Sequence, residues 1–167
     1  MSIADVLQRV ARTGPTGWGV AADTVDLAAM CACTPALWQP LVRDVAGERV
    51  YERLFPEATG GRAAQAWVIT WAPGTSIDLH DHGDAGAAVA VVRGELTEWH
   101  TQRQEPGPLE RRDLPAGSIV ELAADHLHEL RNDGPRPAVS IHVYSSPLDR
   151  MRFYEAVAVY RPIDAAA

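Results

Sequence analysis

Hydrophobic positions recur at two different spacings along this chain. Over residues 1–45, apolar residues return every three or four positions, which is the spacing of an amphipathic helix. We therefore predict two or three helices there. A Pro-Thr-Gly sequence at 15–17 interrupts the first, and Thr34 before Pro35 can begin the last, because Pro is tolerated in a first helical turn.

The pattern changes at about residue 50. Short runs rich in Val, Ile, Trp and Thr follow one another and are separated by Gly, Pro and Asp, which is typical of an antiparallel sandwich or barrel. We predict a β-barrel over residues 50–149, whereas 151–160 could be helix or strand. The clearest strands are 65–71, 87–98, 118–122, 129–132 and 139–144. Turn residues occur at 73–74, 93–94, 106–108, 115–117 and 132–134.

Composition indicates one ordinary globular domain. The 167 residues, 47% hydrophobic and 22% charged, fit a single domain spanning 1–167. No window approaches the roughly 20 apolar residues of a membrane span, and the N-terminus lacks the pattern of a secretory signal. We therefore expect a cytoplasmic protein with no membrane partner. The formal charge of −7 disfavours nucleic acid as a partner.

The types of residue present exclude several kinds of chemistry. All fifteen basic residues are Arg, so neither a Schiff-base lysine nor a phosphate-loop lysine exists. The two cysteines, Cys31 and Cys33, are too few for a four-thiolate metal site or a disulfide framework. We expect them to be reduced and partly buried.

Histidine is the residue type that indicates chemistry here. Two H-x-H pairs occur, His80 with His82 and His126 with His128. Residues two apart on a strand share a face, so each pair can present two imidazoles to one metal ion. A neighbouring strand in a barrel could bring one member of the second pair opposite the first. Of the other two histidines, His142 lies alone on a predicted strand, and His100 lies in a polar stretch and is expected to be solvated.

The surroundings of these pairs resemble the two motifs of the cupin superfamily. The first pair lies between a Pro-Gly turn at 73–74 and Gly94, and the second follows Pro-Ala-Gly at 115–117. The resemblance selects His128 as the third ligand beside His80 and His82, because only His128 has an Asn four residues later. His126 is then expected to lie behind the ligands or to face solvent.

A departure from the cupin pattern concerns the charge of the metal site. Many cupins place a Glu four or five residues after H-x-H, where this chain has Gly86 and Ala87. The site would then have three neutral ligands and as many as three open positions, and it would favour anionic donors from a substrate.

Within the cupins, the chain resembles cysteine dioxygenase. The resemblance is carried by residues 71–82, 91–96 and 137–148, and the last stretch is the most specific. It implies one Fe(II) per chain and oxidation of L-cysteine by O2 to cysteine sulfinate. It also implies that Ser140, His142 and Tyr144, which alternate onto one strand face, form a hydrogen-bonded relay beside the iron.

The same resemblance implies an Arg that holds the substrate carboxylate. Arg53 is the best match, with Arg62 as the fallback, and a guanidinium suits a carboxylate because it donates two parallel hydrogen bonds. Relatives that act on 3-mercaptopropionate tend to have Gln at this place. Some members crosslink the active-site Tyr to a Cys, but this chain has Ala87 at about that position, so we expect no crosslink at Tyr144.

Three alternatives to a cysteine dioxygenase follow from the sequence. The substrate could be another small thiol such as 3-mercaptopropionate. The protein could instead be a non-catalytic cupin that binds a small ligand, although such a protein needs no polar strand beside the metal. Three histidines and a water also describe a catalytic zinc site, but no Glu is placed by the sequence as its base. We expect a monomer in each case.

Overall fold

The computed structural model describes residues 24–55, 65–102, 105–146, 148, 150–155 and 161–163. Its helical elements are α2 (Thr24–Ala32), α3 (Pro35–Trp38) and the 3-10 turn η2 (Gln39–Leu41). The first five strands are β1 (Arg49–Phe55), β2 (Gln65–Trp71), β3 (Ser76–Asp81), β4 (Ala87–Arg93) and β5 (Glu95–Gln102). The others are β6 (Glu105–Pro115), β7 (Ile119–Leu122), β8 (His126–Arg131), β9 (Ala138–Tyr144), β10 (Arg152–Glu155) and β11 (Arg161–Ile163).

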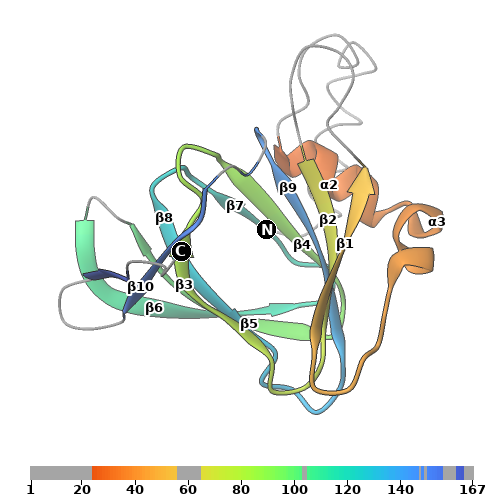
Figure 1. Cartoon of the computed structure of the whole chain (residues 1–167). Helices are drawn as coiled ribbons and strands as arrows, with labels where there is room; N and C mark the ends of the chain where they lie inside the picture. Colours follow the sequence, from red (N-terminus) through yellow and green to blue (C-terminus); the bar gives the residue numbers. More distant parts are fainter. Residues whose placement is uncertain are drawn as a thin grey trace, which may run out of the picture.

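The strands form two antiparallel sheets that face each other (Figure 1). One sheet has the order β1-β2-β9-β4-β7, and the other has the order β11-β10-β3-β8-β5-β6. The predicted mainly β architecture with a helical N-terminal part is therefore confirmed, although no strand pairing closes the two sheets into one ring among the described residues.

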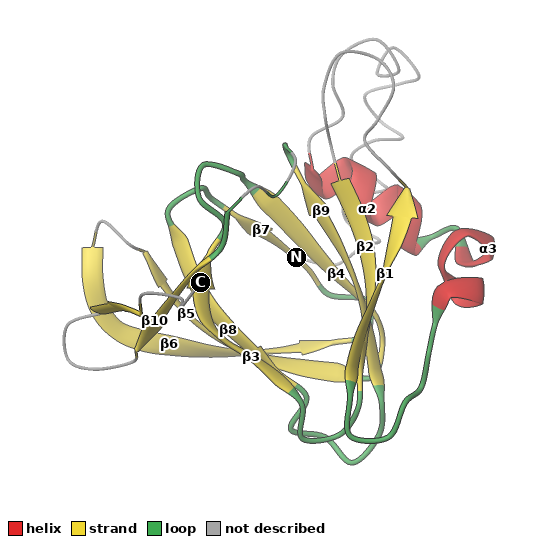
Figure 2. Ribbon diagram, viewed as in Figure 1, coloured by secondary structure: helices red, strands yellow, loops and turns green. Residues whose placement is uncertain are grey.

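The helices lie on the outer face of the five-stranded sheet (Figure 2). Helix α2 buries Val25, Ala28 and Ala29 against odd-numbered residues of β9 such as Ile141. The even-numbered residues of β9 face the space between the sheets, so the whole strand is buried. Both faces of β9 are covered, and the burial of its polar residues must therefore be offset by hydrogen bonds.

Gly94 is the point at which the chain passes from one sheet to the other. Strand β4 belongs to the five-stranded sheet and β5 to the six-stranded one, so residues 87–98 are not one strand but two, divided at the turn predicted for 93–94. The break needs glycine because Gly94 has φ of 71° and an added Cβ would lie 2.9 Å from the Cα of Ala138. The turn predicted at 106–108 is also wrong, since β6 continues through it.

An irregularity in β3 orients the first H-x-H pair. Strand β3 pairs with β8 through Ile77 opposite Leu130 and His80 opposite His128, with a shift in register between the two. Strict alternation would place Ile77 and His80 on opposite faces, but the extra residue of a bulge turns both toward the interior. Leu79 packs with Leu127 in a separate cluster.

Other local predictions have mixed outcomes. Thr34 does precede a helix that begins at Pro35, but its hydroxyl donates to the carbonyl of Met30 and does not cap that helix. Cys31 is buried and Cys33 is exposed, and both are free thiols, so partial burial was wrong for Cys33. The segment 151–160, which the sequence left open between helix and strand, is a strand (β10) from Arg152 to Glu155.

The remaining predictions for the helical region fall outside what the structure describes. Any helix before residue 24 and the break at 15–17 lie among the undescribed residues, as does Arg62. No helix in the described part of the chain is both long and apolar enough to cross a bilayer.

Candidate metal centre

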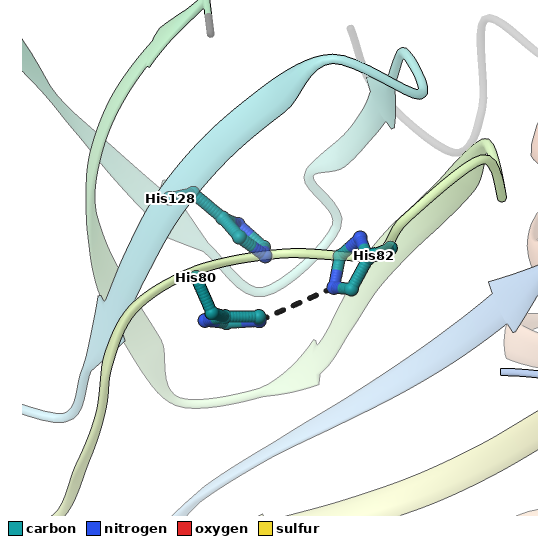
Figure 3. A group of neighbouring side chains, drawn as sticks. All are labelled: His80, His82 and His128. Carbon is teal, nitrogen blue, oxygen red and sulfur yellow. Dashed lines mark hydrogen bonds between the residues drawn. The ribbon is translucent and has the colours of Figure 1, made fainter. Parts of the chain in front are cut away.

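Three buried histidines meet in the space between the sheets. His80 and His82 come from β3 and the residue that follows it, and His128 comes from the neighbouring strand β8 (Figure 3). Each offers one ring nitrogen to a group in which all ligand atoms lie within 4.8 Å of one another. The Nε2 atoms of His80 and His82 are 3.2 Å apart. The structure thus brings together the three residues that the cupin motifs selected.

Hydrogen bonds orient two of these rings. The Nδ1–H of His80 donates to the carbonyl oxygen of Asp78 at 2.7 Å, and the Nδ1 of His128 lies 2.9 Å from the Oε1 of Glu98. Each bond leaves Nε2 unprotonated in the neutral ring. The Nε2 of His128 is buried and has no hydrogen-bond partner among the described residues. A buried lone pair without a partner is what a metal ligand presents before the ion is bound.

Burial keeps the cluster uncharged. Burial, followed by the charges of the neighbouring imidazoles, lowers the pKa of His82 to about 2. Burial also lowers the pKa of His80 and of His128. All three rings are therefore neutral at neutral pH, as metal binding requires. Three imidazoles suit divalent iron, zinc, copper or nickel better than magnesium or calcium, so the residues present fit a transition metal.

The polar side chains of β9 form part of the predicted relay. The Nε1–H of Trp71 donates to the Oγ of Ser140 at 2.9 Å, and this Oγ is 2.9 Å from the Nε2 of His142. The ring of His142 is 6.4 Å from that of Tyr144 between centroids, and the Tyr144 ring lies edge-on to His82 at 5.0 Å. Hydrogen bonds thus connect Trp71, Ser140 and His142, and Tyr144 lies beyond them at the ring distance given above.

His142 and Tyr144, the two titratable residues of this strand face, keep their neutral forms. Burial is the main cause that lowers the pKa of His142 to about 3. Burial also raises the pKa of Tyr144, against the opposing charge of Arg49. Tyr144 is therefore a protonated phenol at neutral pH and can donate a hydrogen bond.

A cavity of about 320 Å³ adjoins the histidine cluster. His80, His142 and Tyr144 line one part of it, and the rest of the wall is mostly apolar and aromatic. The apolar and aromatic lining consists of Tyr51, Trp67, Ile69, Trp71, Ile77, Leu130, Leu148, Met151 and Phe153. A small organic molecule can therefore approach the cluster from the side of His80.

Two arginines of β1 approach this cavity differently. Arg53, the predicted carboxylate anchor, is exposed and its guanidinium lies over the ring of Trp67, 4.8 Å from the centroid, but Arg53 is not itself a lining residue. Arg49 does line the cavity and donates to the carbonyl oxygen of Ser76 at 2.6 Å. The sequence analysis missed Arg49, although its spacing from Tyr51 and Arg53 on one strand was a signal.

Glu98 is the other residue whose importance the sequence analysis missed. It is completely buried, and it contacts His126, His128 and Arg112. His126 is 4% exposed and bonded to Glu98, which agrees with a place behind the ligands rather than in solvent. His100 is only half-buried and stacks on His126, so it is not fully solvated as predicted. No local motif distinguishes Glu98 from an exposed strand Glu.

Solved structures with a similar fold include proteins of diverse kinds. A double-stranded β-helix protein from Klebsiella pneumoniae is 23% identical with a TM-score of 0.53, over 68% of this chain and 90% of that one. TT1209 from Thermus thermophilus is 18% identical with a TM-score of 0.52, over 65% and 92%. A recombinant oxalate oxidase in complex with glycolate is 20% identical with a TM-score of 0.54, over 65% and 59%. At such identities these likenesses show the fold alone.

The family is shown by the sequence itself. The profile of cysteine dioxygenase type I matches residues 48–157, which is more than half of the chain. The matched segment contains both H-x-H pairs, the polar face of β9 and the two arginines of β1. The chain therefore belongs to the cysteine dioxygenase type I family.

Proposed function

We propose that this protein is an Fe(II)-dependent thiol dioxygenase that converts L-cysteine and O2 to cysteine sulfinate. Family membership points to a non-haem iron dioxygenase acting on a thiol. The observation that carries the proposal is the convergence of His80, His82 and His128, without a carboxylate in the same group, beside a cavity. Three neutral ligands leave the charge of a divalent ion uncompensated, which favours a thiolate donor.

Each residue of the site has a role in this proposal. His80, His82 and His128 would hold Fe(II), which supplies the redox chemistry by which both atoms of O2 are added to the thiolate sulfur. Tyr144 keeps its proton at neutral pH and donates a hydrogen bond to the bound substrate. Ser140 is hydrogen-bonded to both Trp71 and His142, and these bonds fix the strand face next to Tyr144.

The substrate carboxylate needs a cation near the cavity. We assign this role to Arg53, whose exposed side chain can turn from the face of Trp67 toward the cavity that Trp67 lines. Arg49 lines the same cavity and is the competing residue. A guanidinium in either place favours a thiol that also carries a carboxylate, as cysteine and 3-mercaptopropionate both do.

The contacts of Glu98 disfavour a zinc hydrolase. Such an enzyme needs a base beside the metal-bound water. Glu98 is a buried carboxylate that contacts the cluster through His128, but its two oxygens already accept hydrogen bonds from His126, His128 and Arg112. It also lies on the Nδ1 side of His128, away from the ring nitrogen that faces the cluster.

The test is anaerobic reconstitution with Fe(II), followed by O2 uptake and sulfinate detection with cysteine and with 3-mercaptopropionate. We expect iron-dependent sulfinate from cysteine. In Arg53→Ala, kcat/KM for cysteine should fall about 10- to 100-fold, because a hydrogen bond to a charged group contributes roughly 1.5–3 kcal/mol. Arg131, an exposed residue paired with Glu129, gives a matched control in Arg131→Ala, which should retain full activity.

The variants also separate the two arginines. If Arg49→Ala loses activity with cysteine while Arg53→Ala keeps full activity, the residue that binds the substrate carboxylate is Arg49 rather than Arg53. Absence of O2 uptake with either thiol, in a protein that holds iron, would overturn the dioxygenase proposal and favour a cupin that binds a ligand without turnover.

A further inference from the structure

Behind the histidine cluster lies a buried group of polar residues that the proposed reaction does not use. Glu98 has no exposed surface, and its Oε1 is 2.9 Å from the Nδ1 of His128 and 3.1 Å from the Nε2 of His126. Its Oε2 accepts a hydrogen bond from the Nε–H of Arg112. Both oxygens of this buried carboxylate thus accept hydrogen bonds from protein side chains.

The strand order explains how these residues meet. Strand β5 lies between β8 and β6, and Glu98 is directly opposite Leu130 on one side and Arg112 on the other. His128 is two residues from Leu130 on the same face of β8, so it is the diagonal neighbour of Glu98. His126 follows at the next inward position.

The carboxylate determines which nitrogen of His128 carries the proton. An ionised carboxylate only accepts hydrogen bonds, so the Nδ1 of His128 must be protonated. The guanidinium of Arg112, which is always charged, lies against the other oxygen of Glu98, so this carboxylate is ionised and accepts from both imidazoles. The lone pair of His128 is then on Nε2, which faces His80 and His82.

We propose that Glu98 is a positioning residue that sets the metal affinity of the three-histidine cluster through His128. This inference rests on the proposed metal site. Glu98 fixes the tautomer and orientation of His128, and it places a negative charge one imidazole away from the ion. The cluster has no carboxylate ligand, so this charge makes the ring of His128 a stronger donor without occupying a coordination position.

Arg112 and His126 support this carboxylate from the far side. Arg112 is one-third exposed and lies on the side of Glu98 away from the cluster, so its charge reduces the field of Glu98 at the metal. His126 donates to the same oxygen as His128 and holds that oxygen in place. Glu98, His126 and His128 can also be viewed as a metal group of their own, but the guanidinium bonded to this carboxylate opposes a second cation.

The central variant is Glu98→Gln, with Glu121→Gln on an exposed position of β7 as its control. An amide can offer its oxygen to Arg112 or to the imidazoles, but its NH2 group must then face the other donor. Glu98→Gln therefore removes the negative charge and weakens the preference of His128 for one tautomer. We expect Fe(II) and Co(II) dissociation constants, measured by chelator competition, to rise about 10- to 100-fold, and those of Glu121→Gln to be unchanged.

A second variant separates positioning from simple destabilisation. Arg112→Gln removes a positive charge while the bond from His128 to Glu98 stays. It should bind Co(II) at least as tightly as the wild type. If the group were only structural, loss of either partner of the ion pair would weaken binding. The visible spectrum of bound Co(II) should change in Glu98→Gln and not in Glu121→Gln, because it reports the ligand field of the ring.

A measurement without metal tests the tautomer itself. Long-range ¹H–¹⁵N NMR of the metal-free wild type should find His128 protonated at Nδ1. Protonation at Nε2, or unchanged metal affinity in a folded Glu98→Gln variant, would overturn the inference while the metal site stood. A wild type that binds no metal would instead overturn the proposed function as well. A second ion per chain that is lost in Glu98→Gln would show that Glu98 is itself a ligand and overturn the positioning role.

Discussion

The contacts of each side chain decide which of the six histidines can act as metal ligands and which only hold the ligands in place. His80, His82 and His128 offer nitrogens to one point, whereas His126 is bonded to Glu98 and His142 to Ser140. His100 is outside the cluster, half-buried, and only stacks on His126. These contacts separate residues that are chemically identical in the sequence.

Replacement of single histidines should reproduce this division. His80→Ala, His82→Ala and His128→Ala should each weaken Fe(II) binding by more than about 100-fold, since even residues behind the ligands typically contribute 10- to 100-fold. His100→Ala is the matched control and should retain one iron per chain. The iron content of each variant after reconstitution and desalting gives the comparison between the ligand variants and the control. Stoichiometric iron in any of the three ligand variants would contradict the assignment.

The histidine pairs show how far residue-level prediction can reach. The H-x-H spacing, with the resemblance to the cupin motifs by which the later Asn selects His128, named the three residues that the structure brings together. The spacing contained no information about Glu98, because its partners come from β6 and β8, far along the chain. Arg49 was missed because an Arg on a strand resembles any solvated residue until its neighbours are known.

At the scale of secondary-structure elements, short irregularities orient the site. The bulge in β3 turns His80 inward together with Ile77, and the break at Gly94 transfers the chain between sheets so that Glu98 lies beside β8. The strands themselves were predicted well where both faces are buried, as in β2 and β9. The turn predicted at 93–94 does divide β4 from β5, but the sequence could not show that the two strands belong to different sheets.

Alanine at two glycines tests the importance of the break. Gly94 and Gly74 both have positive φ, at 71° and 78°, but only Gly94 has close neighbours for an added Cβ. Gly74→Ala should therefore reduce the free energy of unfolding by the backbone term alone, about 1–2 kcal/mol. Gly94→Ala adds an overlap with the backbone of Ala138, and we expect a total loss of roughly 3 kcal/mol or more.

Urea denaturation of the two variants beside the wild type gives the comparison. Equal losses of unfolding free energy in Gly94→Ala and Gly74→Ala would mean that the close approach of β4–β5 to Ala138 is relieved at no cost. The Gly94 break would then be a matter of backbone conformation only.

The whole molecule is a pair of sheets that buries several neutral histidines between them, and this burial makes its stability depend on pH. His82 and His142 are buried between the sheets, and their pKa values are lowered to about 2 and about 3. In the unfolded chain the same groups titrate near 6.5. Between these values the unfolded state binds protons that the folded state does not, so stability falls as pH decreases below about 6.5.

Metal-free protein should therefore lose stability steeply in mild acid. Each of the two histidines contributes a slope that approaches about 1.4 kcal/mol per pH unit below pH 6.5. Urea unfolding at pH 7.5, 6.5 and 5.5 measures this slope. His142→Gln should make it shallower by one histidine's share, and an unfolding free energy that is constant from pH 7.5 to 5.5 would show that the two rings are not buried in neutral form.

The sequence by itself determined the fold class and, through its resemblance to the cupin motifs, which three histidines should lie together. Strand alternation, turn residues and the H-x-H spacing are local features, and local features follow from backbone geometry alone. The tertiary structure decided which face each strand turns inward, where β5 lies, and therefore which carboxylate stands behind His128. These depend on register and on sheet order, which are set by packing between residues far apart in the chain.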